Sequence, residues 1–325
     1  MSYWKKILIF SLIPITFLLV LEMTARQIYP AHSDLPLKYA CFEKKADETV
    51  CLITGHSHAE KGIDPSQLNI PSFNLAYSAQ DLYYTRQTIK KYLPKLEKVK
   101  LIVLAIDPFI FRYDEQNSSP YFVKDYFFSL GIWPRRGFDF QFWLNASVFW
   151  LNRGRFFNDL IDRDIEKKEI RVYKREQAPT SGGEGQYLMD DGQRLAIGIM
   201  NASELKRDAE ATLKRILQHS DRKIISKNFS FLQQLIQSAS GKNIQVIMIY
   251  MPVCQYYNEL IPEEVRKESD MLIKKLLASE KNVEFYDFSD YFKGRNEYFF
   301  NADHLNNQGA KVFSRMLGTT VLKNR

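Results

Sequence analysis

One stretch near the start of the chain decides the fold: Val50-Cys51-Leu52-Ile53-Thr54-Gly55-His56-Ser57-His58. Its first residues form an apolar run, which predicts a strand buried on both faces. Ser57 then lies on the turn where this strand stops. Ligands of open α/β sheets collect at the carboxyl ends of the strands. The position of Ser57 therefore makes it a candidate for chemistry.

A second segment, Asn301-Ala302-Asp303-His304-Leu305-Asn306, lies almost 250 residues further along. It places His304 just ahead of a short amphipathic stretch, Gly309 to Leu317, which predicts a terminal helix. A hydroxyl needs a neighbouring base to become a nucleophile. We therefore expect folding to bring Ser57 and His304 together.

The rest of the chain alternates between strand and helix patterns. Further buried strands are predicted at Phe73 to Tyr77, Val99 to Ile106, Ile244 to Met251 and Val283 to Phe288. Helices are predicted at Leu82 to Leu93, Phe229 to Ser238 and Glu263 to Ala278. This alternation predicts an α/β fold with a doubly wound parallel sheet. At 325 residues, one large domain (29–325) with an insertion is as plausible as two domains.

The interval 109–226 breaks the alternation. It is rich in aromatic pairs such as Phe142-Trp143 and Phe149-Trp150, and it contains a polar loop from Ala178 to Gly185. We interpret it as an aromatic-rich helical insertion that packs over the strand ends. Two alternatives stay open: a subdomain with only its own core, or a surface that lies against the membrane or a membrane partner.

The first 28 residues predict a membrane anchor. Ile7 to Leu21 is almost entirely apolar and follows Lys5 and Lys6. Basic residues before a span keep the N-terminus cytoplasmic. We therefore expect a single-pass inner-membrane protein whose globular part is periplasmic or extracellular. The alternative is a signal peptide cleaved near Ala31-His32-Ser33.

Charge and cysteine content exclude several classes. The net charge is +7, but basic residues are interspersed with acidic ones and form no long stripe, so we expect no nucleic-acid partner. The three cysteines form no disulfide framework and no metal-binding spacing. His56, His58 and His304 are not accompanied by carboxylates at ligand spacing. We therefore predict no metal and no cofactor.

The two segments resemble the SGNH/GDSL hydrolase superfamily. Gly55 to Glu60 and His304 to Ala310, together with the anchor, resemble its membrane-anchored envelope branch, which includes the D-alanyl-transfer protein of teichoic acid synthesis and the alginate O-acetylation proteins. The resemblance implies a flavodoxin-like three-layer α/β/α fold, with Ser57 as nucleophile and His304 as general base. It also implies an oxyanion hole, for which this chain offers the amides of Ser57 and Ser78. Gln80 and His56 are further polar candidates in the cleft.

The chain departs from the family pattern at several positions. His56 stands where the family has an aspartate, and Asn301 stands where the triad acid is expected. Asp107 occupies the place of an oxyanion-hole asparagine. An orienting group holds the imidazole tautomer and stabilises its cation, and Asn301 can do only the first. We therefore expect Asp303, ahead of Asp287, to supply the negative charge.

These observations predict a membrane-anchored serine esterase or O-acyltransferase. Its expected substrate is an acylated envelope glycan or a related acyl donor. One alternative is a noncatalytic partner of a multispan membrane acyltransferase, which the departures at His56, Asn301 and Asp107 favour. Another is a glycan-binding module whose aromatic insertion, including Trp143 and Trp150, stacks on sugars.

Overall fold

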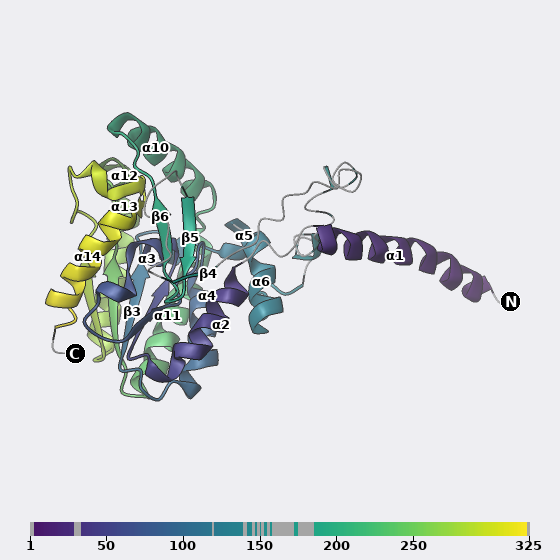
Figure 1. Ribbon diagram of the computed structural model, residues 1–325, viewed down its shortest axis with the longest axis horizontal. Helices are drawn as coiled ribbons and strands as arrows, with labels where there is room; N and C mark the ends of the chain where they lie inside the picture. The colour runs from purple at the N-terminus through teal and green to yellow at the C-terminus, as the bar shows by residue number, and fades with distance from the viewer. Residues whose placement is uncertain are drawn as a thin grey trace.

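The computed structural model describes residues 3–28, 34–118, 120–138 and 185–323, together with 142–144, 147, 150, 153–154, 157 and 172–174. Its centre is a five-stranded parallel sheet with the order β2-β1-β3-β7-β8 (Figure 1). The strands are β1 (Cys51–Gly55), β2 (Ser72–Asn74), β3 (Leu101–Ile106), β7 (Gln245–Tyr250) and β8 (Val283–Asp287). The five predicted strands and their parallel arrangement are confirmed, although β2 is shorter than expected.

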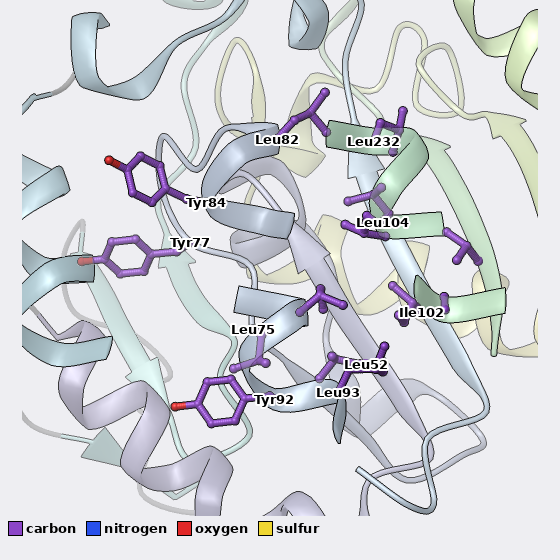
Figure 2. Close-up of a cluster of buried hydrophobic side chains, with 14 of the residues drawn as sticks. Leu52, Leu75, Tyr77, Leu82, Tyr84, Tyr92, Leu93, Ile102, Leu104 and Leu232 are labelled. Carbon is purple, nitrogen blue, oxygen red and sulfur yellow. The ribbon is translucent and has the colours of Figure 1, made fainter. Parts of the chain in front are cut away.

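Helices cover both sides of this sheet because alternate strand residues point to opposite faces. In β3, Ile102 and Leu104 join one buried cluster, whereas Leu101, Val103 and Ala105 join the other. Figure 2 shows the first cluster, in which Leu82 and Leu232 from the helices meet Leu104 from the sheet. Helices that contribute to it are α2 (Leu35–Lys45), α4 (Leu82–Tyr92), α6 (Pro120–Leu130), α11 (Ile225–Ser240) and α13 (Glu263–Ser279).

The second cluster lies on the other face of the sheet. It is built with α3 (Ser57–Gly62), α10 (Ala202–Gln218), α12 (Gln255–Leu260) and α14 (Asn307–Thr320). Each fully buried leucine or phenylalanine contributes about 1.5–3 kcal/mol relative to exposure. Phe313 and Leu317 therefore hold α14 firmly against the sheet.

The predicted insertion is not purely helical. It contains α5 (Glu115–Ser118) and α6, but also a three-stranded sheet of β4 (Val172–Tyr173), β5 (Gly185–Met189) and β6 (Arg194–Ile197). Helix α10 also falls inside 109–226, yet Leu205 and Ala209 belong to the second core cluster. The prediction of a helical insertion was therefore wrong in part. Residues 178–184 of the polar loop lie outside the described residues.

The β5–β6 hairpin is fastened to the main sheet. The amide of Asn74 at the end of β2 donates to the carbonyl of Asp191, at 3.0 Å. Gly192 has a φ of +85°, and a Cβ there would lie 2.1 Å from the carbonyl oxygen of Asn74. Only glycine permits this approach.

A buried ionic network also attaches the β5–β6 hairpin to α3. Arg194 contacts Glu60 at 3.0 Å and also pairs with Asp34, while Lys38 lies 3.2 Å from Glu60. Burial would raise the pKa of Glu60, but the cations of Arg194 and Lys38 outweigh it and lower that pKa. Glu60 is therefore an anion that ties α3 to β6 and α2.

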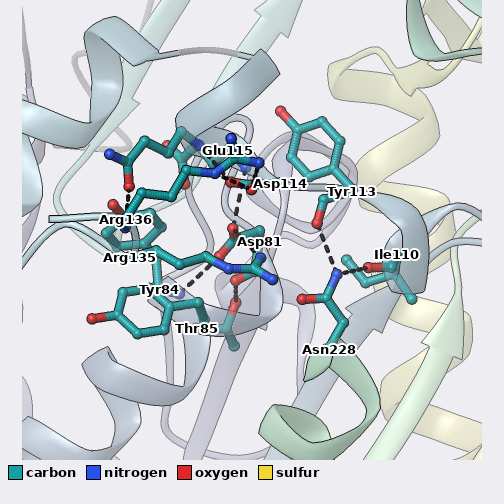
Figure 3. Close-up of polar contacts among 12 residues, drawn as sticks. Asp81, Tyr84, Thr85, Ile110, Tyr113, Asp114, Glu115, Arg135, Arg136 and Asn228 are labelled. Carbon is teal, nitrogen blue, oxygen red and sulfur yellow. Dashed lines mark hydrogen bonds and ion pairs between the residues drawn. The ribbon is translucent and has the colours of Figure 1, made fainter. Parts of the chain in front are cut away.

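A polar cluster fixes the start of the insertion to α4 (Figure 3). One carboxylate oxygen of Asp81 accepts from the amide of Tyr84 at 2.9 Å, which caps α4, and the other accepts from the amide of Glu115 at 3.1 Å. Arg135 lies 3.5 Å from Asp81. Asn228 on α11 donates to the carbonyl of Tyr113 at 2.8 Å. Residues 110–115 are therefore held from two sides.

Helix α1 (Tyr3–Ile28) projects away from the body (Figure 1). Its segment Tyr3–Ala25 is long and apolar enough to cross a membrane. A single-pass anchor is compatible with this helix, and a signal sequence has the same properties. The alternative cleavage site at Ala31-His32-Ser33 lies outside the described residues. The expected boundaries 1–28, 29–325 and 109–226 stay predictions.

Candidate active site

Ser57 is the first residue of α3, directly after the turn that follows β1. Gly55 makes this turn possible: its φ is +117°, and a Cβ there would lie 2.3 Å from the carbonyl oxygen of Ala105. A side chain at position 55 would therefore push β1 and β3 apart. Ser57 itself is only partly buried, so a substrate can reach its hydroxyl.

His304 is presented by a small hairpin just ahead of α14. The hairpin pairs β9 (Phe299–Asn301) with β10 (His304–Leu305) in antiparallel register. Asn306 caps α14, because its side-chain oxygen accepts from the amide of Gly309 at 2.9 Å. The side-chain nitrogen of Asn306 donates to the carbonyl of Glu297 at 2.8 Å. The segment around His304 is thus fixed at both ends.

Folding brings the two predicted residues together. Nε2 of His304 lies 2.7 Å from Oγ of Ser57, and Nδ1 lies 2.8 Å from Oδ1 of Asn301. The amide oxygen of Asn301 can only accept, so Nδ1 carries the proton. Nε2 then has its lone pair free, and the Ser57 hydroxyl donates to it. This is the tautomer that a general base needs.

Asp303 lies beside the same imidazole. One of its oxygens is 2.9 Å from Nδ1 of His304, although the hydrogen-bond geometry is met by Asn301 and not by Asp303. Burial would raise the pKa of Asp303, but His304 and His58 outweigh it and hold that pKa well below its usual range. Asp303 is therefore an anion placed to stabilise positive charge on His304. The other candidate acid, Asp287, instead accepts from Ser289, at 2.9 Å.

The environment keeps His304 neutral. Burial lowers the pKa of His304 to about 4, although the charge of Asp303 opposes the shift. At neutral pH the imidazole is therefore uncharged and able to accept a proton. Its basicity is lower than that of a solvated histidine.

Two further histidines and a carboxylate complete this edge of the sheet. Nε2 of His58 lies 3.5 Å from Asp303, and Nε2 of His56 lies 3.4 Å from Asp107. The rings of His56 and His58 pack edge to face with centroids 4.4 Å apart. Burial, followed by the neighbouring His58, lowers the pKa of His56 well below its usual value.

The approach of carboxylates to these histidines was missed from the sequence. His56, His58 and Asp107 form one group with potential metal-ligand atoms within 4.8 Å of one another, and His58, Asp303 and His304 form another. However, Nδ1 of His56 accepts from the amide of His58 at 3.4 Å, which leaves the proton of the neutral ring on Nε2. Both nitrogens of His304 are also engaged. Ligation of a metal would therefore break existing contacts in both groups.

The other predicted site residues are less directly connected to Ser57. The hydroxyl of Ser78 donates to Glu60 at 2.5 Å, so its side chain belongs to the ionic network that ties α3 to β6 and α2. The amide of Tyr77 donates to the carbonyl of Gly55 at 3.1 Å, which brings the loop of Ser78 beside the Ser57 turn. Within the described part of the chain, the amides of Ser57 and Ser78 donate no hydrogen bond.

The other two polar candidates, Gln80 and His56, are both buried. Gln80 is fully buried, and within the described residues its side-chain nitrogen and oxygen have no hydrogen-bond partner. His56 precedes α3 and caps it through Nδ1. The structure therefore joins Ser57, His304, Asn301 and Asp303 into one group, and His56 caps α3. The expected roles of Gln80 and His56 in the cleft stay predictions.

Comparisons with known proteins add little to this geometry. No family model matches the chain, and no curated protein matches it. A solved structure described as "a putative platelet activating factor from Streptococcus pneumonia" is similar, with 10% identity and a TM-score of 0.39. The match covers 98% of this chain and 99% of that chain. A likeness at this TM-score carries no argument about activity.

Proposed function

We propose that this protein is a membrane-anchored, SGNH-like serine esterase or O-acyltransferase. The observation that carries the proposal is the 2.7 Å contact between Ser57 and Nε2 of His304, together with the acceptor on Nδ1. The strand order β2-β1-β3-β7-β8 supports a flavodoxin-like arrangement, because it corresponds to 2-1-3-4-5 counted along the sheet strands.

The reaction would begin with attack of the Ser57 oxygen on the acyl carbonyl. His304 takes the hydroxyl proton on Nε2 and then gives it to the leaving alkoxide, which leaves an acyl group on Ser57. Water or a sugar hydroxyl attacks this acyl-enzyme, again with His304 as base. No cofactor enters these steps.

Two residues share the work that one aspartate performs in a Ser-His-Asp triad. Asn301 holds the proton on Nδ1 and thereby selects the reactive tautomer. Asp303 supplies the negative charge that stabilises the imidazolium formed during attack. The amides of Ser57 and Ser78 are the donors available for the oxyanion, and such preorganised donors are worth several kcal/mol, roughly 3–4 each.

The location and substrate class are part of the proposal. An anchor at α1 would keep the body beside the membrane, and the lysines before it favour a periplasmic or extracellular body. Acylated envelope glycans and their acyl donors are the esters expected there. A multispan membrane acyltransferase would be a partner that supplies acyl groups.

A noncatalytic accessory role is the second candidate. Its supporting observation is that the residue that accepts the hydrogen bond from Nδ1 of His304 is the neutral Asn301 rather than a carboxylate. The low pKa of His304, about 4, also weakens it as a base. Such a protein would keep the fold and bind the acyltransferase without turning over esters.

Hydrolysis of an aryl acetate by the full chain in detergent separates the two candidates. The enzyme proposal predicts steady turnover that Ser57→Ala abolishes. Ser203→Ala is the matched control, since Ser203 is an exposed serine in the first turn of another helix, α10. Equal rates for the wild type and Ser57→Ala would support the accessory role.

A further inference from the structure

A cluster of aromatic side chains is exposed on the insertion. Phe127 contacts Phe128, Trp133 and Phe138, and Phe138 stacks on Trp143 with ring centroids 5.7 Å apart. Phe128 is 59% exposed, Trp133 63% and Trp143 54%. Exposed apolar patches of this kind mark interaction sites.

This cluster is connected to the end of α1. The amide of Ser147 donates to the carbonyl of Trp143 at 3.1 Å, and the hydroxyl of Ser147 donates to Glu22 on α1 at 2.7 Å. The same hydroxyl accepts from the amide of Trp150 at 3.0 Å. Trp143 and Trp150 are therefore placed on either side of a residue that touches α1.

The contact with Glu22 sets the depth of these rings relative to a membrane. The candidate span Tyr3–Ala25 has 23 residues, which corresponds to about 35 Å of helix. A hydrocarbon core is about 30 Å thick, so Glu22 lies near its outer boundary. Tryptophan and tyrosine are enriched at this level of membrane proteins, where an apolar ring meets hydrated headgroups.

We propose that Phe128, Trp133, Trp143 and Trp150 form an interfacial belt that lies in the same bilayer as α1. Arg153 supports this placement: its guanidinium lies 4.3 Å from the ring centroid of Trp150, which puts a cation at the level of lipid phosphates. The belt gives the body a second attachment beside the helix. The body then faces the bilayer in one orientation rather than swinging on a single tether.

The lipid surface is favoured over a glycan as the occupant. Trp143 and Trp150 are hydrogen-bonded through their backbone to Ser147, which itself contacts Glu22 of α1. Among the described residues, the contacts of the exposed aromatic residues lead to α1, to α6 and, through Tyr83, to α4, and none leads to Ser57 or His304. The proposal is therefore independent of catalysis.

Tryptophan fluorescence of the full chain in lipid vesicles tests the belt. The chain has four tryptophans, and only Trp4 lies outside the insertion. Trp4→Phe protein is reconstituted into phosphatidylcholine–phosphatidylglycerol vesicles whose acyl chains are brominated near the headgroup. We expect most of the emission to be lost relative to unbrominated vesicles, and acrylamide in the water to quench little.

A matched reporter on another surface controls for incidental contact. Tyr291 is 42% exposed and packs against Phe313 of α14, a helix drawn at the opposite side of the body from α1 (Figure 1). In a variant with Trp4, Trp133, Trp143 and Trp150 replaced by Phe and Tyr291→Trp, brominated lipid should leave the emission unchanged. Circular dichroism confirms that each variant is folded.

The quenching results distinguish a lipid contact from exposure to water and from sugar stacking. Strong quenching of the insertion tryptophans by brominated lipid, with none at position 291, supports the belt. The belt is overturned by full acrylamide quenching without lipid quenching. It is equally overturned if added envelope polysaccharide shifts the emission while brominated lipid does not, which would assign the rings to sugar stacking.

Discussion

Of the three imidazoles that lie beside a carboxylate at the carboxyl edge of the sheet, His304 and His56 have different hydrogen-bond partners. His304 has Asp303 and Asn301 on the side of Nδ1, and it has the hydroxyl of Ser57 on Nε2. His56 has Asp107 near Nε2, but its Nδ1 is engaged by the backbone of α3. Residue types are thus similar at the two places, while only one ring has a free lone pair facing a nucleophile.

The difference shows that a histidine–carboxylate pair is not by itself a catalytic group. What distinguishes the two rings is the hydrogen-bond partner of the ring nitrogen that faces away from the carboxylate. At His304 that partner is a hydroxyl that substrate can reach, whereas at His56 it is an amide that needs an acceptor. We therefore propose chemistry at the first ring only, since the second ring caps α3.

The largest effect is expected from His304→Gln. Loss of the general base should lower the rate of ester hydrolysis between about 10²- and 10⁴-fold, while the fold persists. Steady-state kinetics with an aryl acetate measures the loss, and circular dichroism checks the fold. If His56→Gln lowers the rate as much as His304→Gln, the assigned difference between the two rings fails.

The next effect is expected from Asp303→Asn, which removes charge and keeps shape. Because Asn301 still holds the tautomer, we expect a smaller loss, roughly 10- to 100-fold. The pH profile should change as well. Catalysis needs neutral His304, so the wild-type rate falls as pH drops through the His304 pKa of about 4.

The direction in which Asp303→Asn shifts the pH profile follows from the charge of Asp303. Its negative charge raises the pKa of His304 against the effect of burial. Removing that charge lowers the pKa, so the acid limb of the rate profile should move to lower pH. An acid limb that stays in place, or moves upward, would show that Asp303 does not act on this imidazole. Asn301→Ala is the matched control, because it removes the tautomer-holding acceptor and keeps the charge.

How far the sequence predicts this arrangement differs from element to element. The central strands β1, β3 and β7 are apolar runs that are buried on both faces, so hydrophobicity alone predicts them, whereas the edge strand β8 is only half-buried. The pairing of Ser57 with His304 was predicted because Ser57 lies where a strand stops, His304 lies just ahead of a helix, and a serine needs a neighbouring base to become a nucleophile. Both expectations rest on local patterns.

The parts that were missed depend on which strands become neighbours. Gly55 of β1 pairs in register with Ala105 of β3, so His56, one residue further on, and Asp107, two residues further on, lie close together. Nothing in the spacing of these residues shows that register. The strands β4 to β6 were missed because they are short and lie in a region with no periodic apolar pattern.

A smaller effect is expected when the cap at His56 is changed. His56→Asn keeps a good helix-capping side chain and should leave the rate within a few-fold of wild type. His56→Ala removes the cap and should cost about 0.5–2 kcal/mol in the free energy of unfolding. Urea denaturation compares the two variants. Equal stability of both would argue that Nδ1 of His56 does not hold α3.

The most direct measurement is reaction of the full chain with a fluorophosphonate, followed by peptide mass spectrometry. The probe reports an activated serine whatever the natural acyl donor is. Our account predicts a single adduct on Ser57, which is absent in Ser57→Ala and forms far more slowly in His304→Gln. An unlabelled wild-type protein, or labelling that persists without the hydroxyl at position 57, would contradict it.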